Sequence, residues 1–336
     1  MLRQLLAQRW IDPLTAKSSA TSAQSANQPQ RTPSYSLKHR LEYYLSYSLL
    51  KLLGWLPHRL ARAVGRGIAW LVYCLWLRLR RVGLFNLRLV FPDRSERQRH
   101  RVLRGLFRNL GRMLADFAHF PHWSRANIER LIIYDGFENY ARAHDQGKGV
   151  LFLTAHFGNW ELGSFAHGVY GYPCAFIVRE FDNPLLDELI GRYRCLSGGR
   201  AIEKRDSARE VLRAFKRREA VGVLIDQNML ATEGVFVNFL GRPACTTTGP
   251  ARLARVTGVP MVLGLVLWDA KIKKYRLRFD PVEWIKREDP EEEILVNTAN
   301  FTRLIEDYVR RYPDQWLWVH RRWKTRPPGE PSLYPF

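Results

Sequence analysis

A histidine and a glutamate separated by four residues form the first chemically informative pattern in this chain. They are His156 and Glu161 in the segment TAHFGNWEL, whose first residue ends the apolar run VLFLT. A neutral imidazole can accept a proton near neutral pH, and a carboxylate on its other ring nitrogen fixes its tautomer and orientation. The pattern therefore predicts general-base catalysis on an alcohol, with His156 as the base and Glu161 as the group that orients it.

The same spacing also has a purely structural interpretation. A glutamate in a first helical turn is favoured by the helix dipole, and a histidine at a strand end often packs or caps. Asn159 suits the N-cap of a helix that begins at Trp160, and Gly158 permits the tight turn before it. No nucleophile elbow, P-loop, HExxH or GxGxxG motif accompanies the pair, so spacing alone leaves both interpretations open.

The elements that must position this pair follow Pro121, where short apolar runs alternate with helical patterns. Strands are predicted near 130–134, 150–154, 174–178, 221–225, 235–239 and 261–266, and helices near 160–170, 183–196, 206–219, 249–257 and 291–311. This alternation predicts an α/β fold with a mixed central sheet covered by helices, and ligands outside the carboxyl ends of the strands. Asp226 follows the run VGVLI, so it is also expected at a strand's carboxyl end.

The preceding part of the chain divides into two regions. Residues 1–36 are rich in Ser, Ala, Gln and Pro and are interpreted as a flexible tail, although an Arg- and Ser-containing, acid-poor segment also fits an organellar transit peptide. Residues 37–121 are predicted to be helical, with Ser95 as an N-cap, and residues 122–336 form the α/β domain. The apolar, arginine-flanked helices predict a membrane-interfacial region; two ordinary core helices are the alternative.

The composition indicates an anionic partner. The chain carries 53 Lys and Arg against 32 Asp and Glu, a formal net charge of +21, which attracts nucleic acid, anionic lipid or an acidic protein. The 11 Trp, 14 Tyr and 17 Phe favour the lipid headgroup layer among these. The four cysteines lack CxxC spacing, so neither a zinc site nor a disulfide framework is expected.

Five blocks in this order resemble the late lipid A acyltransferases, the lauroyl and myristoyl transferases of Gram-negative bacteria. The resemblance runs from about Leu52 to Tyr334 and is strongest in TAHFGNWEL, FIVREFDNPLLDELIGRYR (176–194), VGVLIDQN (221–228), GVFVNFLGRPACTTTGPARLARVTGVPMV (234–262) and PDQWLWVHRRWKTRP (313–327). It implies a glycerolipid acyltransferase-like fold and makes His156 and Glu161 the catalytic dyad of the H-x4-D/E acyltransferases.

The resemblance also assigns the remaining polar positions. Arg179 would bind a phosphate of the acceptor or help the developing oxyanion, while a surface salt bridge to a neighbouring acid is the structural alternative. Asn183, Asp226 and Gln227 match family positions and are expected, with Asn159, to shape the substrate site rather than to exchange protons.

What the resemblance implies about partners agrees with the charge. The expected donor is an acyl thioester on acyl carrier protein, and the acceptor an anionic lipid A precursor at the cytoplasmic face of the bacterial inner membrane. No cofactor, metal or nucleic acid is expected. A lysophospholipid or an amino-acid lipid is the alternative acceptor, and a non-catalytic basic protein that binds membrane or nucleic acid is the alternative class.

Overall fold

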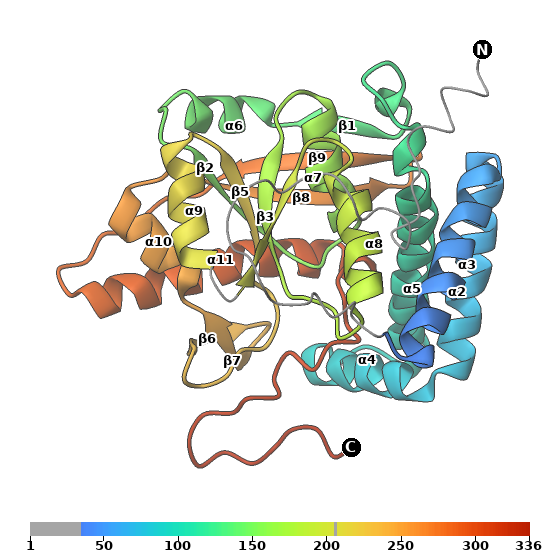
Figure 1. Cartoon of the computed structure of the whole chain (residues 1–336). Coiled ribbons are helices and arrows are strands. Elements are labelled where there is room, and N and C mark those ends of the chain that lie inside the picture. Colours follow the sequence, from blue (N-terminus) through green and yellow to red (C-terminus); the bar gives the residue numbers. More distant parts are fainter. Residues whose placement is uncertain (1–34, 205–206) are drawn as a thin grey trace, which may run out of the picture. The chain divides into compact units, whose positions relative to one another are not determined.

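The computed structural model describes residues 35–204 and 207–336 (Figure 1). The tail predicted over residues 1–36 lies outside the described residues except for Tyr35 and Ser36. Residues 37–336 form one compact unit. The predicted boundary between residues 121 and 122 therefore falls inside one compact unit, which contains both the N-terminal helices and the sheet.

Four helices precede the sheet, in the region that the sequence predicts to be helical; three of them lie before Ser95, where two were expected. The four are α2 (Leu37–Trp55), α3 (His58–Leu75), α4 (Leu77–Val90) and α5 (Glu96–Ala118). The predicted cap at Ser95 is confirmed: its hydroxyl accepts from the backbone N–H of Gln98, whose side chain accepts from the backbone N–H of Ser95. This reciprocal capping box satisfies two donors that the helix leaves unpaired and fixes where α5 begins.

Small residues allow α3 and α5 to pack closely, side by side with α2 (Figure 1). A Cβ atom added at Gly65 would lie 2.3 Å from the carbonyl oxygen of Gly111, a separation that only glycine permits. Ala61 and Ala69 continue the same buried stripe of α3. The stripe packs one side of α3 against α5, and other sides of the helix stay exposed.

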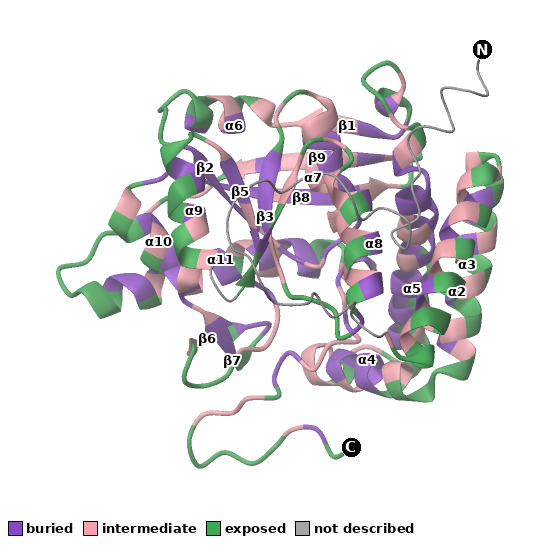
Figure 2. Cartoon of the chain, in the orientation of Figure 1, coloured by how far each residue is buried: buried purple, intermediate pink, exposed green. Residues whose placement is uncertain are grey.

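Large apolar side chains are exposed on α2, α3 and the start of α4, where Figure 2 shows green outer faces. They are Leu37, Leu41, Leu45, Leu52, Trp55, Leu60, Trp70, Leu71, Leu75, Trp76 and Leu77. Among the described residues no single helix is long and apolar enough to cross a membrane, whereas α3 and α4 together pass by length and composition with an 84° bend between them. The interfacial role of these helices stays a prediction.

The central sheet has seven strands in the order β1-β9-β8-β2-β5-β3-β4. Their bounds are Ile132–Asp135 (β1), Val150–Thr154 (β2), Cys174–Val178 (β3), Arg200–Glu203 (β4), Ala220–Leu224 (β5), Met261–Asp269 (β8) and Lys274–Pro281 (β9). All neighbours are parallel except β8 and β9, which makes the sheet mixed. A separate antiparallel hairpin consists of β6 (Gly234–Phe239) and β7 (Arg242–Thr247).

Helices cover both faces of the sheet. On β2, Phe152 contacts Tyr140 of α6 and His167 of α7, whereas the alternate residues Leu151 and Leu153 belong to the core cluster that includes Phe301 of α11. Because side chains alternate along a strand, these helices cover opposite faces. The remaining bounds are Phe137–His144 (α6), Trp160–Val169 (α7), Pro184–Cys195 (α8), Ser207–Lys216 (α9), Gly249–Thr257 (α10) and Pro290–Arg311 (α11), with short 3-10 helices η1 (Phe120–His122), η2 (Ile128–Arg130) and η4 (Pro313–Gln315).

The predicted fold class is confirmed, and each strand and helix predicted after Pro121 has a counterpart. Strands β4, β7 and β9 and helix α6 were not predicted. β4 and β7 carry charged or polar residues at half of their positions, and α6 has only eight residues, so none gives a strong apolar period. The predicted strand over 235–239 exists as β6, but it pairs in the separate hairpin.

Candidate active site

His156 lies two residues beyond β2, at the carboxyl end of the strand, in the turn that leads into α7. Gly158 has a positive φ of 60°, and a Cβ atom there would lie 1.7 Å from the carbonyl oxygen of Val266. Only glycine fits this approach of the turn to β8. The predicted N-cap is confirmed, because the Asn159 side chain accepts from the backbone N–H of Leu162 at 3.2 Å. Turn and cap together fix where His156 stands.

The carboxylate that contacts the His156 ring belongs to Asp226. Its Oδ1 lies 2.8 Å from His156 Nδ1, and its Oδ2 accepts the backbone N–H of His156 at 2.9 Å and the indole N–H of Trp316 at 2.8 Å. Asp226 follows β5, which pairs in parallel with β2, so the two carboxyl strand ends bring 156 and 226 together. Three donors thus hold one buried carboxylate against the ring.

These contacts assign the protons of the ring. Burial alone raises the pKa of a carboxyl group, but the His156 charge and the hydrogen bonds outweigh it and keep the pKa of Asp226 below its usual value. The ionised carboxylate can only accept, so Nδ1 carries the proton of a neutral His156 ring, and Nε2 of that neutral ring presents its lone pair. The Gln227 amide nitrogen lies 3.1 Å from that Nε2, as a donor to it would. This is the tautomer that a general base needs.

Glu161 lies elsewhere than the sequence analysis expected. Its carboxylate accepts from Arg194 of α8 at 2.8 and 2.5 Å and from the indole N–H of Trp160 at 3.2 Å. Among the described residues, the hydrogen-bond partners of the His156 ring are Asp226 and Gln227. The expected orientation of the ring by Glu161 is therefore corrected to Asp226, because the Glu161 carboxylate is held by Arg194 in α8; any other part of Glu161 in catalysis stays a prediction.

His156 and Glu161 nevertheless line the same cavity, of about 790 Å³. Its remaining polar residues include Arg179, Arg194, Gln227 and Asn228, and much of its lining is apolar, including Phe152, Phe176, Leu212, Leu224, Leu253, Val266, Leu277 and Phe279. Gly222 of β5 and Gly264 of β8 also line it, and their missing side chains leave room beside the sheet. A cavity of this lining suits an apolar chain that ends at a small polar group.

His167 adds a buried polar group to this cavity. Burial lowers its pKa to about 3, so the ring is neutral and behaves as part of the aromatic wall with Tyr140 and Phe152. Its Nδ1 lies 3.2 Å from the Tyr134 hydroxyl. An uncharged imidazole leaves the apolar character of the wall intact.

The other predicted site residues divide into two groups. Arg179 follows β3 and lines the cavity, as Gln227 does. Asn183 and Asn159 do not line it. The Asn183 amide caps α8 and donates to the carbonyl of His39 and the carboxylate of Glu42 in α2, while the Asn159 amide donates to Asp116. Both amides are committed to joining helices, so the substrate-binding role predicted for them gains no support from their positions.

Asp116 was missed by sequence reasoning and supports, through Asn159, the turn that carries His156. This fully buried carboxylate of α5 accepts from His58 and Arg62 of α3, from Asn159 and from the Tyr275 hydroxyl of β9, with its closest contacts at 2.7 Å. Burial raises the pKa of a carboxyl group, but Arg62 and the hydrogen bonds outweigh it and leave the pKa of Asp116 lowered. One ionised group therefore ties α3 to the residue that caps α7.

Two further residues act on the same site from the C-terminal segment. Trp316 holds Asp226, and the fully buried Arg322 donates to the backbone carbonyls of Gln227 and Cys245. Trp316 and Arg322 both lie in the block PDQWLWVHRRWKTRP (313–327), one of the five blocks on which the family resemblance rests. No group of three or more His, Cys, Asp or Glu side chains that could hold a metal ion occurs in residues 35–204 and 207–336.

Comparison with known proteins decides the family. The family model described as bacterial lipid A biosynthesis acyltransferase matches residues 28–325. The chain belongs to this family. Similar members include the lipid A biosynthesis palmitoleoyltransferase of Escherichia coli (strain K12), 31% identical over 251 residues, which cover 74% of this chain and 80% of that protein. The fold and the cavity beside His156 thus belong to a chain of an acyltransferase family.

Two other family members match over more of the chain. The lipid A biosynthesis lauroyltransferase of Escherichia coli (strain K12) is 30% identical over 292 residues, which cover 87% of this chain and 94% of that protein. A lipid A biosynthesis acyltransferase of Haemophilus influenzae is 28% identical over 312 residues, which cover 91% of this chain and 98% of that protein. The family match thus includes both the N-terminal helices and the sheet.

Proposed function

We propose that this chain transfers a fatty acyl group from a thioester on acyl carrier protein to a hydroxyl of a lipid A precursor. Membership of the lipid A acyltransferase family supports the acceptor class. The single observation that carries the chemistry is the His156–Asp226 pair at the wall of a largely apolar cavity. Such a pair activates an alcohol, and such a cavity accommodates an acyl chain.

The proposed reaction needs no covalent acyl-enzyme. His156 Nε2 takes the proton of the acceptor hydroxyl, whose oxygen attacks the thioester carbonyl, while Asp226 stabilises the imidazolium through Nδ1–H. The attack forms the new C–O bond, collapse of the tetrahedral intermediate breaks the C–S bond, and the leaving thiolate takes the proton from His156. The acceptor hydroxyl would occupy the place where the Gln227 amide now meets Nε2.

Two arginines line the cavity with different roles in this proposal. Arg194 is paired with the half-buried carboxylate of Glu161 and so holds α7 against α8. For Arg179, no hydrogen bond or ion pair is found among the described residues, which leaves its guanidinium for an acceptor phosphate or the acyl oxyanion. The basic charge of the whole chain would also favour an acidic carrier protein.

The membrane attachment we propose rests on the exposed apolar side chains of α2–α4. They would enter the headgroup layer of the inner membrane from the cytoplasmic side. A double variant Leu71→Gln, Leu75→Gln on α3 is expected to reduce flotation with lipid vesicles. The matched variant Leu295→Gln, which replaces an exposed leucine of α11, should float as the wild type does. Equal flotation of all three proteins would refute the attachment.

The decisive experiment is mass spectrometry of acyl transfer from labelled acyl carrier protein to a tetra-acylated lipid A precursor. The wild type and a His144→Ala control, in which an exposed histidine of α6 is replaced, should add one acyl chain. His156→Ala should add none. If the wild type acylates a lysophospholipid or an amino-acid lipid instead, the acceptor is not a lipid A precursor. If it acylates no lipid, the alternative of a non-catalytic basic binding protein replaces the proposal.

A further inference from the structure

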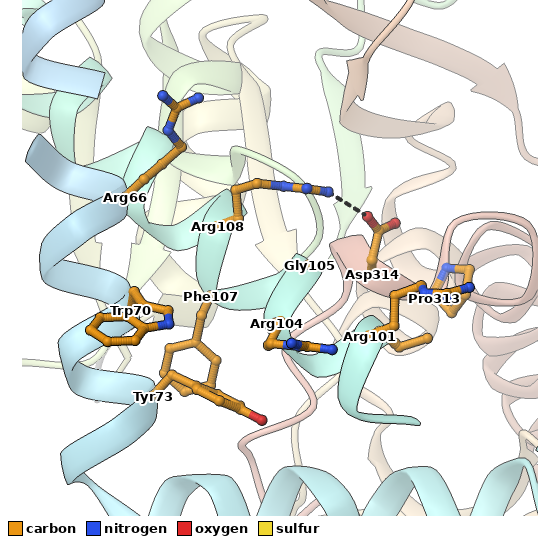
Figure 3. Close-up of a pocket in the computed structure, with 11 residues that line it drawn as sticks. Arg66, Trp70, Tyr73, Arg101, Arg104, Gly105, Phe107, Arg108, Pro313 and Asp314 are labelled. Carbon is orange, nitrogen blue, oxygen red and sulfur yellow. Dashed lines mark ion pairs between the residues drawn. The ribbon is translucent and has the colours of Figure 1, made fainter. Parts of the chain in front are cut away.

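A second hollowed surface lies on the flank formed by α3, α5 and the turn between β8 and β9. It consists of three adjoining hollows of about 650, 980 and 860 Å³, all lined by Arg66. We call them together the arginine groove. Figure 3 shows the first, with Arg66 and Trp70 on α3 and Arg104 and Arg108 on α5. None of the residues that line the groove lines the His156 cavity.

The groove carries a large excess of positive charge. Thirteen lysines and arginines line the three hollows against three aspartates. Each aspartate already faces an arginine: Asp269 binds Arg276, Asp135 binds Arg278, and Asp314 lies 3.7 Å from Arg108 (Figure 3). The hollow beside Pro57 and Trp123 is lined by six of these cations and by no acid. Unbalanced charge in a concave surface attracts anions strongly.

Arg112 stands at the centre of the groove and lines two of the three hollows. Only 5% of the residue is exposed, its guanidinium lies 4.4 Å from the centre of the Trp268 ring, and its buried Nε has no partner. It forms no hydrogen bond or ion pair with any described residue. Burial lowers the pKa of Arg112 accordingly. A desolvated cation without a partner is costly, so this one is arranged for an anion from outside.

The nearest carboxylate on its own helix is already occupied. Asp116, one turn further along α5, accepts from both Arg62 and His58 of α3. Arg62 also lies over the Trp268 ring, at 5.1 Å, so two guanidinium groups share one ring, whereas the carboxylate is bonded to Arg62. Arg112 and, beside it, the exposed Arg66 have no carboxylate partner among the described residues.

The position of the groove on α3 identifies its ligand. Arg59, Arg62, Arg66 and Trp70 line it from one side of the helix, while the exposed Leu60, Leu71 and Leu75 lie on another. A helix that buries apolar residues in a bilayer brings its basic flank to the level of the lipid phosphates. Hollows lined by arginine, tryptophan and tyrosine fit a compact phosphate with its hydration shell better than a flat protein face.

We propose that the arginine groove is a binding site for the phosphate headgroup of an anionic membrane lipid, separate from the catalytic cavity, with Arg112 and Arg66 as its central ligands. The site goes beyond acyl transfer, since it needs neither donor nor acceptor in the His156 cavity. A lipid bound there would fix the orientation of the protein on the membrane surface, and therefore the direction in which the His156 cavity opens.

The test is flotation of the full-length protein with phosphatidylcholine vesicles that contain phosphatidic acid. Arg112→Gln and Arg66→Gln should each weaken binding about fivefold, the loss expected for one basic side chain at an anionic surface. The matched control Arg97→Gln removes an exposed arginine of α5 that does not line the groove, and it should change binding less than twofold. Equal losses in all three variants would mean diffuse attraction and would overturn the site.

Three further measurements separate the sources of the anion and the role of Arg112. In the first, oleic acid replaces phosphatidic acid in the vesicles, so that the negative charge is the same but no phosphate is present. Arg112→Gln and the wild type should bind these vesicles equally. Inorganic phosphate that raises the Tm of the wild type, with no preference for phosphatidic acid, would make the ligand a soluble phosphate and refute the lipid. Arg112→Gln should keep or raise the Tm, since a buried unpaired charge is removed; a lower Tm with unchanged vesicle binding would make Arg112 purely structural.

The groove and the proposed acyl transfer can fail independently. His156→Ala should bind phosphatidic acid vesicles as the wild type does, because it leaves every groove residue in place. Loss of acyl transfer with intact binding therefore concerns the catalytic cavity alone. Intact acyl transfer to a soluble acceptor, with vesicle binding that is insensitive to Arg112 and Arg66, would overturn the groove alone.

Discussion

Replacement of Asp226 by asparagine tests which carboxylate orients His156, the proposed general base. Oδ2 of Asp226 accepts two N–H groups, from Trp316 and from the His156 backbone, so the amide oxygen of an asparagine must take that place. The amide NH₂ group then faces His156 Nδ1. It can only donate there, which moves the ring proton to Nε2 and removes the lone pair that would accept the substrate proton. Asp226→Asn should therefore leave the fold intact and supply the wrong tautomer.

The expected loss in kcat is about 10³- to 10⁴-fold, the range found where a histidine base is held in the wrong tautomer or is lost. The assay is the acyl transfer reaction under saturating donor and acceptor, with the Tm as a check on folding. Glu161→Gln is the matched variant, since it also replaces a carboxylate by an amide on the same cavity. It should lose stability through Arg194 but far less kcat. A result in which Asp226→Asn stays within tenfold of the wild type, while Glu161→Gln loses about a thousandfold, would refute the assignment and restore Glu161.

Three other changes have defined outcomes. Asp116→Ala should lower the free energy of unfolding by about 3–5 kcal/mol because it strands Arg62 in the interior, and urea titration beside the exposed control Asp145→Ala checks this; a loss equal to that of the control contradicts it. Gly222→Ile fills a wall of the cavity and should select against long acyl chains by about fourfold per methylene that no longer fits, so an unchanged chain-length profile of the product argues against an acyl site there. Burial lowers the pKa of His320 to about 4. Below about pH 6.5 the unfolded chain therefore binds a proton that the folded chain does not, and the free energy of unfolding falls by up to about 3 kcal/mol between that pH and pH 4. His320→Gln should flatten this part of the Tm-against-pH curve.

Local features of the site could be predicted from the sequence. The strand VLFLT, the turn at Gly158 and the cap at Asn159 are determined by residues within a few positions of one another, and all three are confirmed. The same holds for the capping box at Ser95. Such features depend on short-range hydrogen bonds and on backbone conformation, which a single sequence displays directly.

Pairings across the sheet could not be predicted in this way. Asp226 lies 70 residues from His156, and its place beside the ring depends on β5 being the neighbour of β2. The sequence did place Asp226 at a strand's carboxyl end, which is a signal that two such ends meet at one edge. The spacing of Glu161 drew attention to the nearer carboxylate, although Arg194 on another helix binds it. The alternating strand KYRLRFDP was also missed, since its polar face hid its buried Tyr275, Leu277 and Phe279.

The contacts of the N-terminal helices limit how this enzyme can be divided. Asp116 joins α3 to the cap of the catalytic helix, and the Asn86 amide of α4 holds the carbonyls of Trp318 and His320, in the segment that delivers Trp316 to Asp226. A variant trimmed to residues 122–336 would therefore lose the contacts that position the proposed base, His156. Chimeras between relatives should exchange residues 37–121 together with the segment after Tyr312, because the side chains of these two parts, remote in sequence, contact each other and have to match.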